Sequence, residues 1–175
     1  MSDSPRIEAE RHTALDDMGL LRKPGSPEFD EMCERIRAQF QTAAALVKLV
    51  DNNRIIIAAQ SGIDLGDYLP RHEAFSDHTI RSEEILVVPD AAKDPRFAHN
   101  PLVSGERHIR FYAGAPLIYL RDVRLGALCL LDGRPRGPVG FTLGDKAELV
   151  GMAEEVVSVI VERELNDRFD AGRSR

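Results

Sequence analysis

The fold is decided by two apolar segments in the second half of the chain, FYAGAPLIYL at residues 111–120 and RLGALCLL at residues 124–131. Only the charged turn Arg121-Asp122-Val123 separates them, so they are predicted to form an antiparallel pair of strands. In a regular strand Phe111 and Tyr112 face opposite sides of the sheet, so at most one of them lines a cavity.

Further strands and helices are predicted on both sides of this pair. The segment between residues 51 and 53 is rich in Asp and Asn, which favours a hairpin between two apolar runs. Helix starts are indicated by Ser4-Pro5 and Ser26-Pro27, and a capping-box-like start by Thr142-Leu143-Gly144-Asp145. The predicted helices cover residues 5–22, 27–40 and 142–165, with one or two helical turns at 75–81, and the further strands cover 45–50, 54–60 and 85–88.

This order of elements predicts an α+β fold. We expect a central antiparallel sheet of five or six strands with the N- and C-terminal helices packed on one face. Irregular segments and short helices, from residues 62–72 and 91–109 among others, are expected to cover the other face. A single domain is predicted for residues 5–167, followed by a polar C-terminal tail at 168–175.

Composition narrows the class of protein. The chain has 175 residues, 30% of them charged, and a net charge of −6, which argues against nucleic-acid binding. No apolar run approaches the roughly 18 residues of a membrane helix, and the polar start Met1-Ser2-Asp3-Ser4-Pro5 predicts no secretory signal. Two cysteines favour a reducing compartment, so a cytoplasmic location is expected.

Four stretches then carry a family resemblance. They are VVPDA at 87–91, DPRF at 94–97, NPLV at 100–103 and IRFYAGAPL at 109–117. Together with RLGALCLLD at 124–132 they resemble a GAF subfamily, a GAF/PAS-like fold whose members often precede histidine kinases or diguanylate cyclases. The resemblance spans roughly residues 7–165 and implies a sensory domain. It identifies no ligand and predicts no particular cofactor, so the cofactor is unknown.

Departures from the family pattern exclude several ligands. We find no match to the Asn-Lys…Phe…Asp-Glu signature of GAF domains that bind cyclic nucleotides. Many relatives have cysteine at the position of Ser76, and neither Cys33 nor Cys129 adjoins a histidine, which argues against a covalently attached bilin. Methionine-sulfoxide reductases of this family use a cluster of cysteines, and two isolated cysteines do not reproduce that chemistry.

The resemblance places the pocket between the sheet and the segments 75–80 and 90–112. Asp90 and Asn100 either bind a ligand or cap short helices. Arg96 and Arg110 either grip an anion or form ion pairs with Asp90 or Asp94, while aromatic side chains form a pocket wall or plain core. The predicted ligand-binding residues are Asp90, Arg96, Phe97, Asn100, Arg110, Tyr112 and His78.

No catalytic motif and no metal site is predicted, and His78 alone is weak evidence for metal ligation. We therefore expect a sensory domain that is not an enzyme. A homodimer is predicted through a stripe on the last helix, formed by Leu149, Met152, Val156 and Ile160. The partner is expected to be a histidine kinase or diguanylate cyclase. Two alternatives remain: a dimerising interaction module with a vestigial pocket, or a reductase-like enzyme.

Overall fold

The computed structural model describes residues 4–121 and 123–173, and its centre is an antiparallel sheet of six strands in the order β3-β2-β1-β6-β5-β4. The first three strands are β1 (Ala44–Val50), β2 (Arg54–Ser61) and β3 (Tyr68–Pro70), and the last three are β4 (Leu86–Val88), β5 (Phe111–Leu120) and β6 (Val123–Asp132). The predicted α+β class and sheet are confirmed, and β3 is a strand within a segment predicted to be a loop.

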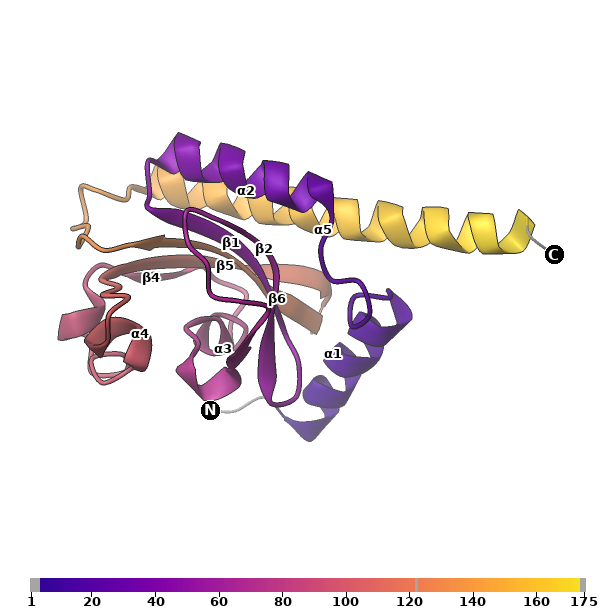
Figure 1. Cartoon of the computed structure of the whole chain (residues 1–175), viewed down its shortest axis with the longest axis horizontal. Coiled ribbons are helices and arrows are strands. Elements are labelled where there is room, and N and C mark those ends of the chain that lie inside the picture. The colour runs from indigo at the N-terminus through magenta and orange to yellow at the C-terminus, as the bar shows by residue number, and fades with distance from the viewer. Residues whose placement is uncertain (1–3, 122, 174–175) are drawn as a thin grey trace.

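Two helices cover one face of the sheet, as expected. Figure 1 shows α2 (Pro27–Phe40) and α5 (Leu143–Arg173) side by side above the strands. Alternating residues of β1 and β5, such as Val47 and Phe111, pack against them together with Ile36 and Leu149. An ion pair between Arg35 and Glu155 joins the two helices at their exposed edge.

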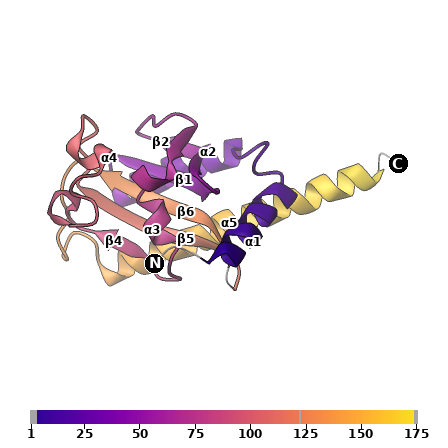
Figure 2. The same ribbon diagram turned by 90° about the horizontal axis from the view of Figure 1, so that it is seen from below.

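Short elements cover the opposite face, which Figure 2 shows from below. They are η1 (Arg71–Glu73), α3 (Ser76–Thr79), η2 (Ala91–Lys93) and α4 (Pro101–Ser104). A second apolar cluster lies beneath them, with Leu46, Cys129 and Tyr112 from the sheet and Phe75 and Phe97 from the cover. Phe111 and Tyr112 thus face opposite sides, as strand geometry predicts.

The first helix, α1 (Pro5–Asp17), lies across the end of the sheet and packs against β6. Ser4 caps its start, and Gly19, with φ +69°, turns the chain away after Asp17. The helix therefore ends five residues before the predicted boundary at residue 22, because the left-handed glycine at position 19 stops it.

The last helix is longer than predicted. It continues through Leu165 to Arg173, so residues 168–173 of the expected polar tail are helical and extend beyond the sheet (Figure 1). Three parts of the sequence predictions lie outside the described residues. They are Met1–Asp3, where no secretory signal is predicted, Asp122 of the predicted turn, and residues 174–175 of the predicted tail. None of the described helices is long and apolar enough to cross a membrane.

Candidate functional site

A line of polar side chains crosses the apolar face beneath α3. The Tyr112 hydroxyl lies 2.6 Å from Thr79 Oγ1 and 3.4 Å from Cys129 Sγ. All three residues are fully or almost fully buried. With Lys48 and Ser76, described next, they form what we call the buried polar cluster: Lys48, Ser76, Thr79, Tyr112 and Cys129.

Lys48 and Ser76 are the members of this cluster that lack partners. Both are completely buried, and no hydrogen-bond partner is found for Lys48 Nζ or Ser76 Oγ within the part of the chain that the structure describes. Ser76 lies one helical turn before Thr79 on the same buried side of α3. Burial lowers the pKa of Lys48. A buried polar atom without a partner is costly, so these two atoms need an explanation.

Gly114 makes room for the hydroxyl group of Tyr112. A Cβ at this position would lie 2.1 Å from the Tyr112 oxygen and 2.8 Å from Thr79 Oγ1. The absence of a side chain at Gly114 therefore allows the Tyr112 hydroxyl to reach Thr79 on α3.

Aromatic rings form a wall beside the cluster. The Phe75 ring stacks on Tyr112, with centroids 4.8 Å apart, and lies 4.4 Å from the Phe97 ring. The half-buried imidazole of His78 meets the Phe97 ring edge-on at 4.8 Å. Burial, followed by repulsion from Arg81, lowers the pKa of His78. Of the seven predicted ligand-binding residues, the structure brings together Phe97, Tyr112 and His78.

Asp90 and Asn100 cap short helices. Asp90 accepts a hydrogen bond from the Ala92 amide at 3.1 Å, and Asn100 accepts one from the Leu102 amide at 2.9 Å. Asn100 also donates to the Glu73 carbonyl at 2.9 Å, which ties α4 to η1. Of the two roles predicted for Asp90 and Asn100, ligand binding or helix capping, the structure shows helix capping.

The two predicted anion-binding arginines are also occupied within the chain. Arg96 forms two hydrogen bonds to Asp94, at 3.0 and 2.7 Å. Arg110 donates to the carbonyls of Val103 and Ile109 and lies 3.0 Å from His108 Nδ1. Arg110 thus ties the end of α4 to the start of β5, while Arg96 forms a local, half-exposed pair with Asp94.

The predicted dimer stripe faces the interior of the chain. Leu149, Val156 and Ile160 are buried against the chain's own sheet, and Met152 is partly buried beside them. A second copy has no access to these three side chains, so the prediction that they form a dimer contact does not fit this structure. These side chains belong to the apolar cluster that α5 shares with the sheet and α2.

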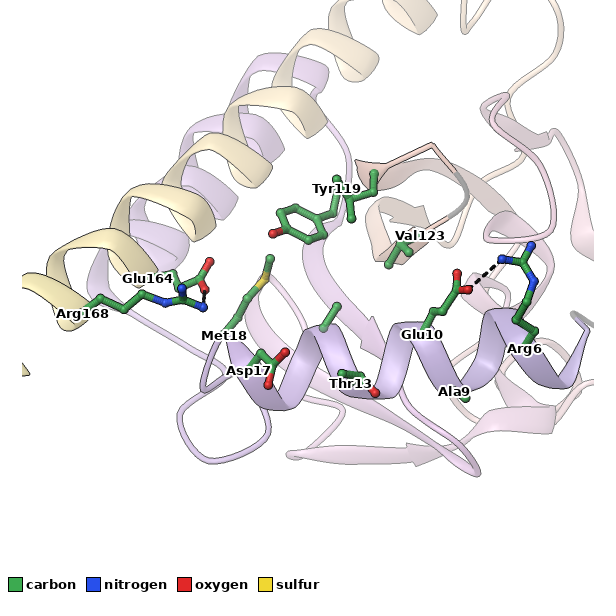
Figure 3. Close-up of a pocket in the computed structure, with 12 residues that line it drawn as sticks. Arg6, Ala9, Glu10, Thr13, Asp17, Met18, Tyr119, Val123, Glu164 and Arg168 are labelled. Atoms are coloured by element: carbon green, nitrogen blue, oxygen red, sulfur yellow. Dashed lines mark hydrogen bonds and ion pairs between the residues drawn. The ribbon is translucent and has the colours of Figure 1, made fainter.

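A groove of about 500 Å³ lies between α1, the end of the β5–β6 hairpin and the distal part of α5. Figure 3 shows Met18 and Tyr119 between the two helices, with the Arg6–Glu10 and Glu164–Arg168 pairs at its margins. This α1–α5 groove is separate from the buried polar cluster, which lies under α3.

The two thiols lie on opposite faces of the sheet. Cys33 packs among the helices, and Cys129 belongs to the buried polar cluster. Burial raises the pKa of Cys33 to about 12 and also raises the pKa of Cys129. They do not form the nucleophile and resolving pair that reductase chemistry needs. No group of three metal-ligating side chains occurs among the described residues.

An ion-pair network links α3 to α1. Arg71 donates to both carboxylate oxygens of Glu8, at 2.6 and 2.7 Å, and to Asp77 at 2.6 Å. Burial raises the pKa of Glu8 and Asp77, but hydrogen bonds from Arg71 and other arginines outweigh it, so both pKa values are lowered. Since Asp77 sits between Ser76 and Thr79, the network couples the cover of the cluster to α1.

Replacing Arg71 with methionine should therefore lower the free energy of unfolding at pH 7 by about 2–3 kcal/mol, because it leaves two partly buried carboxylates without their main donor. Carboxylates with lowered folded pKa values stabilise the fold above their unfolded pKa, and this contribution disappears as the pH falls through the folded pKa. The variant should thus lose less stability than wild type between pH 6 and pH 3, measured by urea unfolding. Arg35→Met, which removes a pair exposed on both sides, should change stability by less than about 0.5 kcal/mol. Parallel pH curves for Arg71→Met and wild type would contradict the assignment.

The comparisons with known proteins agree with this architecture. The family model of the GAF domain matches residues 26–160, so the chain belongs to the GAF domain family. The GAF domain of a phosphoenolpyruvate-protein phosphotransferase from Acinetobacter superposes with a TM-score of 0.64 at 22% identity, covering 86% of this chain and 93% of that one. Free methionine-R-sulfoxide reductase from Neisseria meningitidis, in complex with its substrate, gives a TM-score of 0.63 at 15% identity, covering 93% and 88%. At these identities both likenesses show the fold alone.

A curated relative from Pseudomonas aeruginosa bears the name cyclic di-GMP phosphodiesterase and is 39% identical over 135 residues, which are 77% of this chain. This finding corrects the expectation that the protein is not an enzyme, because a protein of that similarity is named as one. The chain spans 23% of the length of this relative.

Sequence reasoning missed Lys48 and Ser76. The available signal was a single lysine inside the apolar run AALVKLV at residues 44–50, where alternation places it on the same face as Leu46 and Val50. Ser76 was considered only as a position lacking cysteine.

Proposed function

We propose that this GAF domain binds a small molecule at the buried polar cluster and acts as a sensory, regulatory domain. The observation that carries the proposal is the pair of buried atoms without partners, Lys48 Nζ and Ser76 Oγ, beneath a cover of short elements. A stable core satisfies its buried polar groups, so polar atoms left unpaired under a thin cover are typical of a site completed by a ligand.

The likeness to the Pseudomonas relative supports an output in cyclic di-GMP turnover. We propose that the domain regulates an enzyme that acts on this nucleotide, which replaces the broader expectation of a histidine kinase or diguanylate cyclase partner. The Arg71 network offers a physical route for the signal, because a ligand that shifts α3 acts on α1 through Asp77 and Glu8.

Native mass spectrometry of freshly purified protein tests the ligand-binding proposal. We expect a defined additional mass that is lost on unfolding and regained when a small-metabolite extract is returned. Hydrogen exchange of residues 75–80 should slow when that mass is bound. No bound mass, together with unchanged exchange in the extract, would contradict the proposal.

We also propose that the domain forms a homodimer through the distal half of α5. This part of the helix extends past the sheet, and it exposes half of Leu165 and 71% of Phe169. Exposed apolar side chains on an extended helix favour pairing with a second helix.

Replacing both Leu165 and Phe169 with lysine should convert a dimer to a monomer in sedimentation velocity, because it places like charges in the contact and removes its apolar area. The folded monomer should remain intact, since both positions lie outside the core. Wild-type protein that sediments as a monomer at micromolar concentration, or a variant that remains dimeric, would disprove this interface.

A further inference from the structure

Lys48 has a buried side-chain amine with no hydrogen-bond partner and no counterion among the described residues. Within the described residues three buried side-chain atoms lack hydrogen-bond partners, and two of them are Lys48 Nζ on β1 and Ser76 Oγ on the buried side of α3. The third, Arg37 Nε, is on α2. A buried ammonium without a counterion is among the costliest groups a core can hold.

The register of the sheet fixes where Lys48 lies. It pairs with Ala127 of β6, so its side chain shares a face with Cys129, the next residue of β6 on that side. The amine and the Cys129 sulfur are close enough to interact electrostatically. Because α3 contacts β1, β5 and β6, the amine lies in the layer that α3 covers.

The nearby carboxylate of α3 is committed elsewhere. Asp77 is held by Arg71 and Arg81, each at 2.6 Å. The other members of the buried polar cluster offer hydroxyl groups and a thiol with a raised pKa. The cluster therefore has one buried amine whose charged form an anion beside it would stabilise, and one hydroxyl, that of Ser76, free to donate.

From this arrangement we propose that the ligand is a singly charged carboxylate with an apolar body, and that Lys48 is its counterion. One ammonium and one hydroxyl match the two oxygens of a carboxylate. Beside the cluster the buried rings of Phe75, Phe97 and Tyr112 stack on one another, so the apolar body of the molecule would bind by parting these rings. This inference rests on the proposed ligand-binding function and specifies its chemistry.

The same balance of charge argues against phosphate-containing ligands. A phosphate monoester carries close to two negative charges at pH 7 and three acceptor oxygens, which exceed what one ammonium and one hydroxyl satisfy. A cyclic dinucleotide, the compound in the name of the Pseudomonas relative, carries two charged phosphates. The sensed molecule is therefore distinct from the nucleotide.

Thermal unfolding of the whole chain tests this proposal. Sodium benzoate is the carboxylate probe, and sodium chloride and sodium phosphate at equal ionic strength are the comparison salts. Three proteins are compared: wild type, Lys48→Met, and Lys23→Met as a control at an exposed lysine. In chloride, Lys48→Met should melt about 3–6 °C above wild type, because an apolar side chain of similar length replaces an unpaired buried amine. Benzoate should raise the melting temperature of wild type and Lys23→Met but not of Lys48→Met.

Ser76→Ala provides a second variant that retains the fold, since it removes only a hydroxyl without a partner. It should weaken benzoate binding about tenfold, as expected for loss of one hydrogen bond to a charged group. This variant keeps the proposal testable if Lys48→Met does not fold.

Several results would overturn the proposal. They are equal stabilisation of all three proteins by benzoate, stabilisation of wild type by phosphate as strongly as by benzoate, no stabilisation of wild type by benzoate, or a lower melting temperature for Lys48→Met in chloride. A bound mass that Lys48→Met retains in native mass spectrometry would reject the carboxylate and leave the ligand-binding function standing. Absence of any bound mass in wild type, together with unchanged hydrogen exchange of residues 75–80 in the metabolite extract, would reject both.

Discussion

Gly126→Ala should destabilise the protein by about 3–5 kcal/mol, a large effect for a single methyl group. A Cβ at Gly126 would lie 1.9 Å from the backbone oxygen of Lys48 and 2.8 Å from the Cα of Leu49. These are backbone atoms of the neighbouring strand β1, so relief requires β1 and β6 to separate at the centre of the sheet. The free energy of unfolding from urea titration measures the effect.

The matched control is Gly151→Ala on α5. A Cβ there meets no atom within 4 Å, and alanine is the better helix former, so stability should rise by about 0.5–1 kcal/mol. The same methyl group thus has opposite effects at the two positions. Equal effects at Gly126 and Gly151 would show that β1 and β6 do not approach each other as described.

Leu149→Ala should cost about 2–5 kcal/mol of unfolding free energy, because it leaves a cavity at a fully buried position between α5 and the sheet. Since this side chain faces the core, the oligomeric state should not change. Urea unfolding gives the first quantity and sedimentation velocity the second.

Leu143→Ala serves as the control for Leu149, because Leu143 is 81% exposed at the start of the same helix. Its effect should be below about 0.5 kcal/mol. A Leu149→Ala variant of nearly wild-type stability that dissociates a dimer would restore the face of α5 that the sequence predicted as the interface.

The sequence predicts the main elements of the fold because local signals and periodicity agree there. Serine caps followed by proline mark the starts of α1 and α2, and the hairpin of β5 and β6 follows from two apolar runs around a short turn. The direction in which α5 faces depends on tertiary contacts. Its apolar stripe is equally compatible with a sheet or a second copy, and only the structure shows that Leu149 and Val156 contact the sheet.

The candidate site was predictable in part. The segments that cover it were located from family resemblance, and Phe97, Tyr112 and His78 lie there together. The polar residues with the strongest motifs, Asp90 and Asn100, proved to be helix caps, because a short side chain before a helical turn finds its own backbone first. Lys48 escaped notice because its significance depends on an absent partner, which no sequence pattern reveals.

A crystal structure of freshly purified protein at high resolution would show directly what surrounds Lys48 Nζ. We expect non-protein density within about 2.7–3.2 Å of Nζ and of Ser76 Oγ, beside the Phe75 ring. Lys48 paired with a carboxylate of its own chain, or extended to solvent past α3, would contradict the proposed ligand site.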